Sequence, residues 1–164
     1  GKIICCCLKE KGNTEIYKLY LKDALPISPM RVLAALSLLL LSLTTHADVI
    51  GLDPQGLQQM MAKGVPLVDV RTPKEWHQTG IIKGAHLLTF FDEKGHYDIP
   101  DWMAKFSKIA GKDDPVILVC RTGHRTHEIG QFLNEKRGYT RVYELRGGIT
   151  HWMKTGHETV APNP

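Results

Sequence analysis

Short apolar runs alternate with stretches of helical length from about residue 53 to residue 154. Strands are predicted at 66–70, 84–88, 115–119 and 141–145, and the run at 115–119 is the clearest buried strand. Helices are predicted after Asp53, after Thr72, over 100–110, over 126–137 and after the glycine pair at 147–148. This alternation predicts an α/β fold: a mostly parallel sheet flanked by helices on both faces, in three layers.

Local signals support several of these boundaries. Asp53 followed by proline is typical of a helix N-cap, and the segment from Thr72 to Glu75 has the pattern of a capping box. Gly138 stands where a helix would end in the left-handed conformation. The segment 92–95 is predicted to turn.

The segment before Asp48 has the pattern of a secretory signal. Met30 and Arg31 precede an apolar run over 32–43, and Ala47 closes a small-x-Ala pattern suited to cleavage. The run is shorter than the roughly 20 residues of a membrane span. We therefore expect a signal peptide from Met30 to Ala47, a periplasmic mature chain and no stable membrane insertion after cleavage. An uncleaved N-terminal anchor is the alternative.

Residues 1–29 show no periodicity and contain three consecutive cysteines, 5–7. Because a signal peptide should begin at its own methionine, we interpret this stretch as upstream read-through or an assembly artefact. A cysteine-rich metal or lipid site is the alternative, but the run lacks the C-x-x-C spacing of zinc sites. The expected organisation is thus 1–29 non-native, 30–47 signal and 48–164 one domain.

Composition adds two constraints. The chain is 43% hydrophobic and 23% charged, enough to form a packed core. Its net charge of +4 resides mostly in the first 47 residues: from Asp48 onward there are 15 Lys and Arg against 14 Asp and Glu, a net charge of +1. A nearly neutral domain argues against a nucleic-acid partner.

Cys120 is the single cysteine after residue 47, and it follows the predicted strand 115–119 directly. Ligands bind at the carboxyl ends of parallel strands, and a loop entering a helix presents backbone N–H groups and positive potential. Arg121 and Arg125 add charge, so the surroundings favour the thiolate of Cys120 and an anionic ligand. The alternative, an inert buried cysteine, fits poorly with such polar neighbours.

Four motifs in this order resemble the rhodanese family. They are C-R-T-G-H-R-T at 120–126, L-V-D-V-R at 67–71, E-W followed by G-I-I-K-G-A within 75–85, and V-Y-E-L-R-G-G with a later tryptophan within 142–152. The resemblance covers about residues 50–157. Ile81 departs from the pattern, because the family has histidine at this position.

The resemblance implies a rhodanese-like fold and a thiosulfate sulfurtransferase activity without a cofactor or metal. Cys120 would carry sulfur as a persulfide, taking it from an anionic small-molecule donor and passing it to a thiol or cyanide. The substrate-binding loop would comprise Arg121, Thr122, Gly123, His124, Arg125 and Thr126. Arg121 and Arg125 are expected to shape the pocket and bind the anion. Bracing of the loop by Arg125 through hydrogen bonds to backbone carbonyls is the alternative.

Three alternatives stay open. Related phosphatases and arsenate reductases have one more residue between Cys and Arg, so the spacing from Cys120 to Arg125 favours sulfur transfer over oxyanion chemistry. A non-catalytic binding module and a redox role are the others.

We expect structural roles, and no direct part in the chemistry, for several other residues. Asp69 and Arg71 are expected to support the site, Asp69 through hydrogen bonds. His124 and His127 are three residues apart, but no third metal ligand is suggested by spacing. Phe90 and Phe91 are expected in the core rather than at the pocket.

Overall fold

The computed structural model describes residues 48–162. The predicted non-native segment 1–29 and the predicted signal peptide Met30–Ala47 lie outside the described residues and stay predictions. No helix of the described segment is long and apolar enough to cross a membrane.

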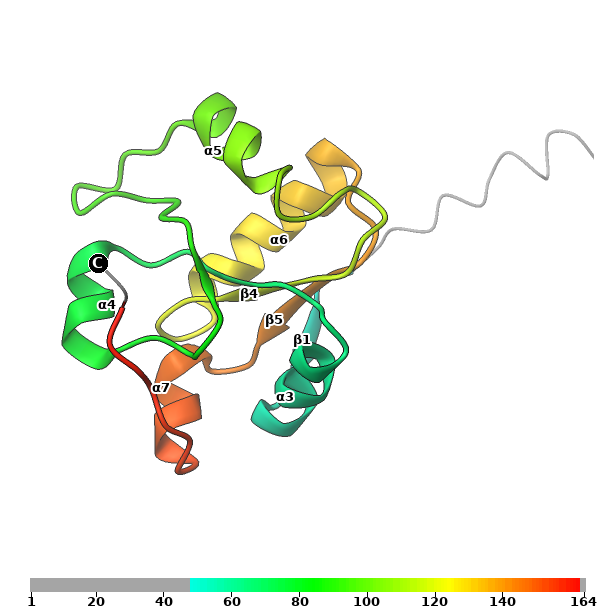
Figure 1. Cartoon of the computed structure of the whole chain (residues 1–164). Coiled ribbons are helices and arrows are strands. Elements are labelled where there is room, and N and C mark those ends of the chain that lie inside the picture. Colours follow the sequence, from blue (N-terminus) through cyan, green and yellow to red (C-terminus); the bar gives the residue numbers. More distant parts are fainter. Residues whose placement is uncertain (1–47, 163–164) are drawn as a thin grey trace, which may run out of the picture. The chain divides into compact units, whose positions relative to one another are not determined.

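The described chain folds into one five-stranded parallel sheet with helices between the strands (Figure 1). The strand order is β1-β5-β4-β2-β3, which places β4 at the centre. The strands are β1 (Ile50–Leu52), β2 (Leu67–Asp69), β3 (His86–Leu87), β4 (Val116–Val119) and β5 (Val142–Leu145). The helices are α3 (Pro54–Ala62), α4 (Pro73–Thr79), α5 (Ile99–Phe106), α6 (His124–Arg137) and α7 (Gly148–Lys154).

Alternate residues of the central strands enter two separate cores. Val116 and Leu118 of β4 pack with Phe106 of α5 and Leu133 of α6. On the opposite face, Ile117 and Val119 pack with residues of α3 and α7: Leu57, Ile149 and Trp152. Figure 1 shows α5 and α6 on one side of the sheet, with α3 and α7 on the other. The predicted three-layer α/β fold is confirmed.

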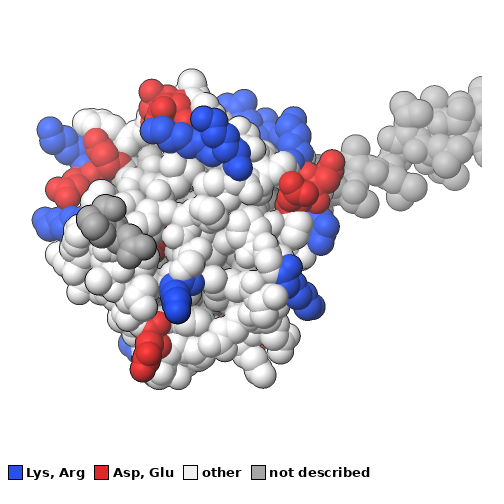
Figure 2. Space-filling view, viewed as in Figure 1, with Lys and Arg blue, Asp and Glu red and all other residues white. Residues whose placement is uncertain are grey.

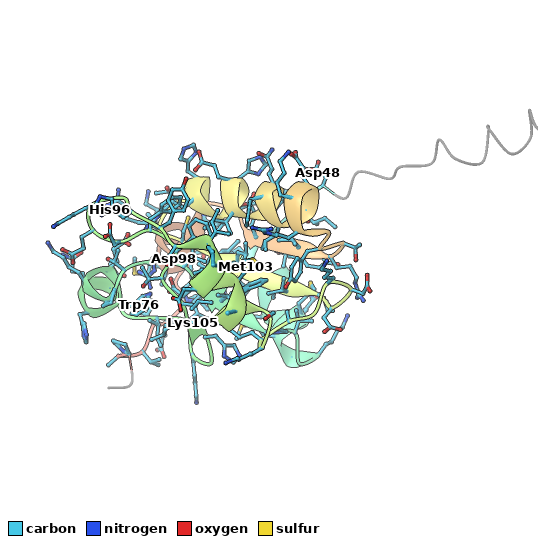
Figure 3. All side chains as sticks on the ribbon, turned by 90° about the horizontal axis from the view of Figure 1, so that it is seen from above. Asp48, Trp76, His96, Asp98, Met103 and Lys105 are labelled. Atoms are coloured by element: carbon cyan, nitrogen blue, oxygen red, sulfur yellow. The ribbon has the colours of Figure 1, made fainter. Side chains whose placement is uncertain are left out.

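Side-chain caps fix the beginnings of three helices. The Thr72 hydroxyl accepts from the Glu75 N–H while the Glu75 carboxylate accepts from the Thr72 N–H, so the predicted capping box is present. Asp53 and Asp98 accept from the N–H three residues later, at the starts of α3 and α5. In Figure 3, Asp98 precedes α5, and the α5 and α6 ribbons run over the same side of the sheet.

The structure differs from the sequence prediction in several elements, and strand β3, at His86–Leu87, is shorter than the predicted 84–88. Strand β1 was not predicted, because three residues containing a glycine show no measurable alternation. Helix α5 ends at Phe106 rather than at residue 110, and the following residues form turns. Helix α6 starts at His124 rather than at 126, because Gly123 takes a left-handed conformation (φ 97°) that turns the chain directly into the helix.

Charged side chains of both signs are interspersed on the face seen in Figure 2. This agrees with the nearly neutral charge of the segment from Asp48 onward.

Candidate active site

Cys120 lies at the carboxyl end of the central strand β4, immediately before the loop that leads into α6. Strand β2 ends beside it, because Asp69 pairs with Val119 and the Val70 N–H donates to the Val119 carbonyl at 3.0 Å. The predicted position of the cysteine in a strand-loop-helix unit is therefore correct.

The sulfur of Cys120 is enclosed. The residue is 1% exposed and belongs to the core beneath α5 and α6, although Arg121 and Thr122 after it are exposed. The Gly123 N–H donates to its Sγ at 3.1 Å, and the Thr126 hydroxyl lies 3.7 Å from the same sulfur. The polar residues after Cys120 suggested that the cysteine is not in the core, and this was wrong. Strand β4 keeps the thiol buried, while Arg121 and Thr122 of the loop are exposed.

Two carbonyls at the start of the loop accept hydrogen bonds from α7. The Ile149 N–H donates to the Cys120 carbonyl at 2.9 Å, and the Thr150 N–H donates to the Arg121 carbonyl at 3.1 Å. These donors belong to the first turn of α7, where helix N–H groups lack partners within the helix. Helix α7 thus fixes the start of the loop through these two hydrogen bonds. The Gly123 N–H of the loop donates to the sulfur.

Gly148 makes this contact possible. A Cβ added at Gly148 would overlap the Cys120 carbonyl and lie 2.6 Å from the Arg121 carbonyl oxygen, and the φ of Gly148 is +58°.

We expect Gly148→Ala to lower the free energy of unfolding by at least about 1 kcal/mol more than Gly138→Ala, because overpacking adds to the backbone strain. Gly138 is the matched control, with φ +74° and nothing within 4 Å of an added Cβ. Urea unfolding of both variants measures the difference; equal losses would contradict a close approach at Gly148.

Arg125 is held by a carboxylate. Its guanidinium donates to both Glu75 oxygens, at 2.9 and 2.6 Å, so the partner is a side chain of α4 and not a backbone carbonyl. Burial lowers the pKa of Arg125, but the hydrogen bond and charge of Glu75 outweigh it and raise this pKa, and Cys120 acts in the same direction. Burial raises the pKa of Glu75, but hydrogen bonds from Arg125 and the Thr72 backbone, with the charges of Arg125 and Arg71, hold it below its ordinary value. The pair therefore keeps both charges and ties α6 to α4.

Asp69 and Arg71 form a second pair, fully buried. The Arg71 Nη2 lies 2.7 Å from Asp69 Oδ2, and both side chains are 0% exposed. Arg71 also donates to the Thr79 hydroxyl at 2.7 Å and the Gly80 carbonyl at 2.8 Å. These contacts join the end of β2 to the end of α4, and the supporting role expected for Asp69 and Arg71 stays a prediction.

An open cleft of about 540 Å³ lies over the loop. Cys120 does not line it, whereas four loop residues do. Acidic and basic side chains are mixed around it; the lining residues are Thr72, Lys74, Glu75, Gln78, Asp92, Glu93, Arg121, Thr122, His124 and Arg125. Because Arg125 is paired with Glu75, Arg121 provides the exposed guanidinium of the loop. Phe90 and Phe91 line a different, apolar cleft of about 230 Å³.

The two histidines near the loop bind carboxylates. His124 lies 3.4 Å from Glu128, and His127 lies 3.3 Å from Glu144. Within residues 48–162, no group of three His, Cys, Asp or Glu side chains could hold a metal ion.

The structure thus brings Cys120, Gly123 and Thr126 into direct contact, and it places Arg121, Thr122, His124 and Arg125 at the cleft. Two participants were not identified from sequence as site residues: Glu75, recognised only as a cap, and Glu144. Glu75 and Arg125 are 50 residues apart, and no local pattern indicates such a pair.

Comparison with known proteins gives a consistent result. The family model for the rhodanese-like domain matches residues 53–155. A relative named "Sulfurtransferase" from Allochromatium vinosum is 37% identical over 113 residues, covering 68% of this chain and 94% of that protein. The thiosulfate sulfurtransferase GlpE of Stutzerimonas stutzeri is 28% identical over 102 residues, covering 62% and 83% of the two chains.

The fold is also similar to a solved structure. The polysulfide-sulfur transferase homodimer of Wolinella succinogenes matches with a TM-score of 0.52 and 21% identity, covering 70% of this chain and 80% of that one.

Proposed function

Because the chain belongs to the rhodanese-like domain family, we propose that it is a thiosulfate sulfurtransferase that carries sulfur on Cys120 as a persulfide. The relatives named as sulfurtransferases support sulfur transfer in general. The observation that carries the proposal for this chain is the Gly123 N–H, which donates to Cys120 Sγ at 3.1 Å in a loop beside a guanidinium. An N–H donor and a nearby positive charge both favour a thiolate nucleophile.

The proposed reaction has two displacements. The Cys120 thiolate attacks the outer sulfur of thiosulfate, the S–S bond of the donor breaks, and sulfite leaves with the bonding electrons. An acceptor thiolate or cyanide then attacks the outer sulfur of the persulfide, and the Cys120 thiolate is the leaving group. No redox partner, metal or cofactor is required, and the two halves predict ping-pong kinetics.

The residues of the cleft have separate proposed roles. Arg121 is exposed at the cleft and would attract the anionic donor, while Arg125, bound to Glu75, would hold its charge near the sulfur. Since Cys120 does not line the cleft, the donor's outer sulfur must enter the loop to react. Gly123 would then stabilise the persulfide by the same hydrogen bond that it gives to the thiol sulfur.

Sulfur loading tests the proposal directly. We expect thiosulfate without an acceptor to release one sulfite per chain and to add one sulfur atom to the peptide containing Cys120, as measured by mass spectrometry. Added cyanide should remove that sulfur and restore the unmodified peptide.

Absence of sulfite release and of loading would exclude thiosulfate as the donor. Loading by a polysulfide under the same conditions would retain sulfur transfer, and failure of both donors would favour a binding module. Export to the periplasm stays a further proposal, supported by the sequence pattern from Met30 to Ala47.

A further inference from the structure

Thr126 lies between the nucleophile and a carboxylate. Its side chain is fully buried, 3.7 Å from Cys120 Sγ and 2.8 Å from Glu144 Oε2. Its hydroxyl oxygen is also 2.8 Å from the Gly123 carbonyl oxygen. One hydroxyl therefore touches a thiol, a carboxylate and a carbonyl.

This arrangement contains more acceptors than the hydroxyl has protons. The Gly123 carbonyl only accepts, an ionised Glu144 only accepts, and Thr126 has one proton to donate. Two assignments satisfy the contacts. Either the Cys120 S–H donates to Thr126 and Thr126 donates to Glu144, with the Gly123 carbonyl accepting from the His127 N–H at 3.1 Å, or a protonated Glu144 donates to Thr126 and Thr126 donates to the Cys120 thiolate. The two assignments differ by the position of one proton.

We infer that Glu144 holds the proton that Cys120 gives up, with the Thr126 hydroxyl passing it between them. The S–H proton moves to Thr126 Oγ1 while the Thr126 proton moves to Glu144 Oε2. The products are the Cys120 thiolate and a neutral carboxyl group, so charge and protons balance. The inference rests on the proposed function insofar as Cys120 is the nucleophile.

The surroundings of Glu144 suit this role. The side chain is 13% exposed and contacts His127 Nδ1 at 3.3 Å, whose own side chain is 48% exposed, so the proton has a route to solvent. By contrast, Glu75 is tied to Arg125 by two short hydrogen bonds and keeps its charge. The enclosed sulfur of Cys120 has no comparable exposure of its own.

The groups that face Glu144 come from several elements. Helix α6 contributes Thr126 and His127, and Thr126 in turn contacts Cys120 at the end of β4. Strand β1 contributes Gly51, which pairs with Glu144 and over which the Arg146 side chain lies. Helix α7 packs on the opposite face of the sheet.

Alkylation of Cys120 by iodoacetamide across pH tests the inference, because the thiolate is the reacting form. The rate is followed in the whole chain by mass spectrometry of the peptide containing Cys120. We expect two steps in the parent, since two groups share protons, and one step in Glu144→Gln. Near pH 6 the parent rate should exceed the Glu144→Gln rate by about tenfold, roughly one pH unit in the position of the step, because only the parent has a carboxylate that accepts the Cys120 proton.

Two Thr126 variants separate proton sharing from the charge of Glu144 alone. Thr126→Val keeps that charge but removes the hydroxyl, so we expect a single step at higher pH, and Thr126→Ser should restore two steps. Glu135→Gln, at an exposed position of α6, is the control for loss of a carboxylate and should match the parent.

A Glu144→Gln profile equal to that of the parent, or two steps in a folded Thr126→Val, would overturn the inference. Thermal unfolding shows whether each variant is folded. If Thr126→Val is unfolded, the number of steps in Glu144→Gln and in Thr126→Ser decides whether Glu144 and Cys120 share a proton. Alkylation needs no sulfur donor, so this result is independent of whether thiosulfate is the substrate.

Discussion

Cys120→Ser is expected to lose sulfurtransferase activity by at least about a thousandfold. An alcohol is far less acidic than a thiol, and an attacking serine would have no way to form a persulfide. The neighbouring groups cannot replace it, because the Gly123 N–H and Arg125 stabilise charge but offer no nucleophile. Steady-state release of thiocyanate from thiosulfate and cyanide measures the loss.

In the full chain, cysteines 5–7, which lie before the predicted mature segment, provide the control for this variant. Replacing all three by serine removes every thiol of the chain except Cys120, and we expect this triple variant to keep its activity. If Cys120→Ser were instead to retain activity while the triple variant lost it, the assignment of the nucleophile would be wrong. A melting temperature for Cys120→Ser close to that of the parent shows that the loss is chemical.

Arg71→Met is expected to destabilise the fold by about 3–5 kcal/mol, the range for breaking a buried ion pair from one side. The substitution leaves the Asp69 carboxylate 0% exposed without its cation, and it removes the donors to the Thr79 hydroxyl and the Gly80 carbonyl. Urea unfolding monitored by tryptophan fluorescence gives the free energy of unfolding.

A second substitution tests the physical reason. In the double variant Asp69→Leu with Arg71→Met no charge is left buried, so it should be more stable than Arg71→Met alone. The uncapped Gly80 carbonyl should keep it less stable than the parent. A cost below about 1 kcal/mol for Arg71→Met would show that the pair contributes little.

The central part of the fold was predictable from short-range patterns. The run over β4 is buried on both faces and therefore apolar throughout, and the capping box at Thr72 is local, so both are readable in sequence. Strand β1 was not predictable from sequence. It is an edge strand whose three residues are defined by pairing with β5, more than 90 positions away along the chain.

The candidate site, too, was predictable from sequence only in part. Cys120 and the arginines after it lie in one continuous motif, and their place at the end of a strand follows from that motif. The burial of Cys120, the pairing of Arg125 with Glu75 and the contact of Thr126 with Glu144 depend on tertiary packing. No spacing along the chain indicates them.

The support of the loop by α7 also affects the order in which the protein is made. A nascent polypeptide that has reached Leu145 contains every residue from Cys120 to Thr126 but lacks the two amide donors at 149 and 150. Because domains fold as units during synthesis, the loop acquires its support only after translation has passed residue 150. A ribosome stalled before that point therefore holds a chain whose cysteine has not yet received its final surroundings.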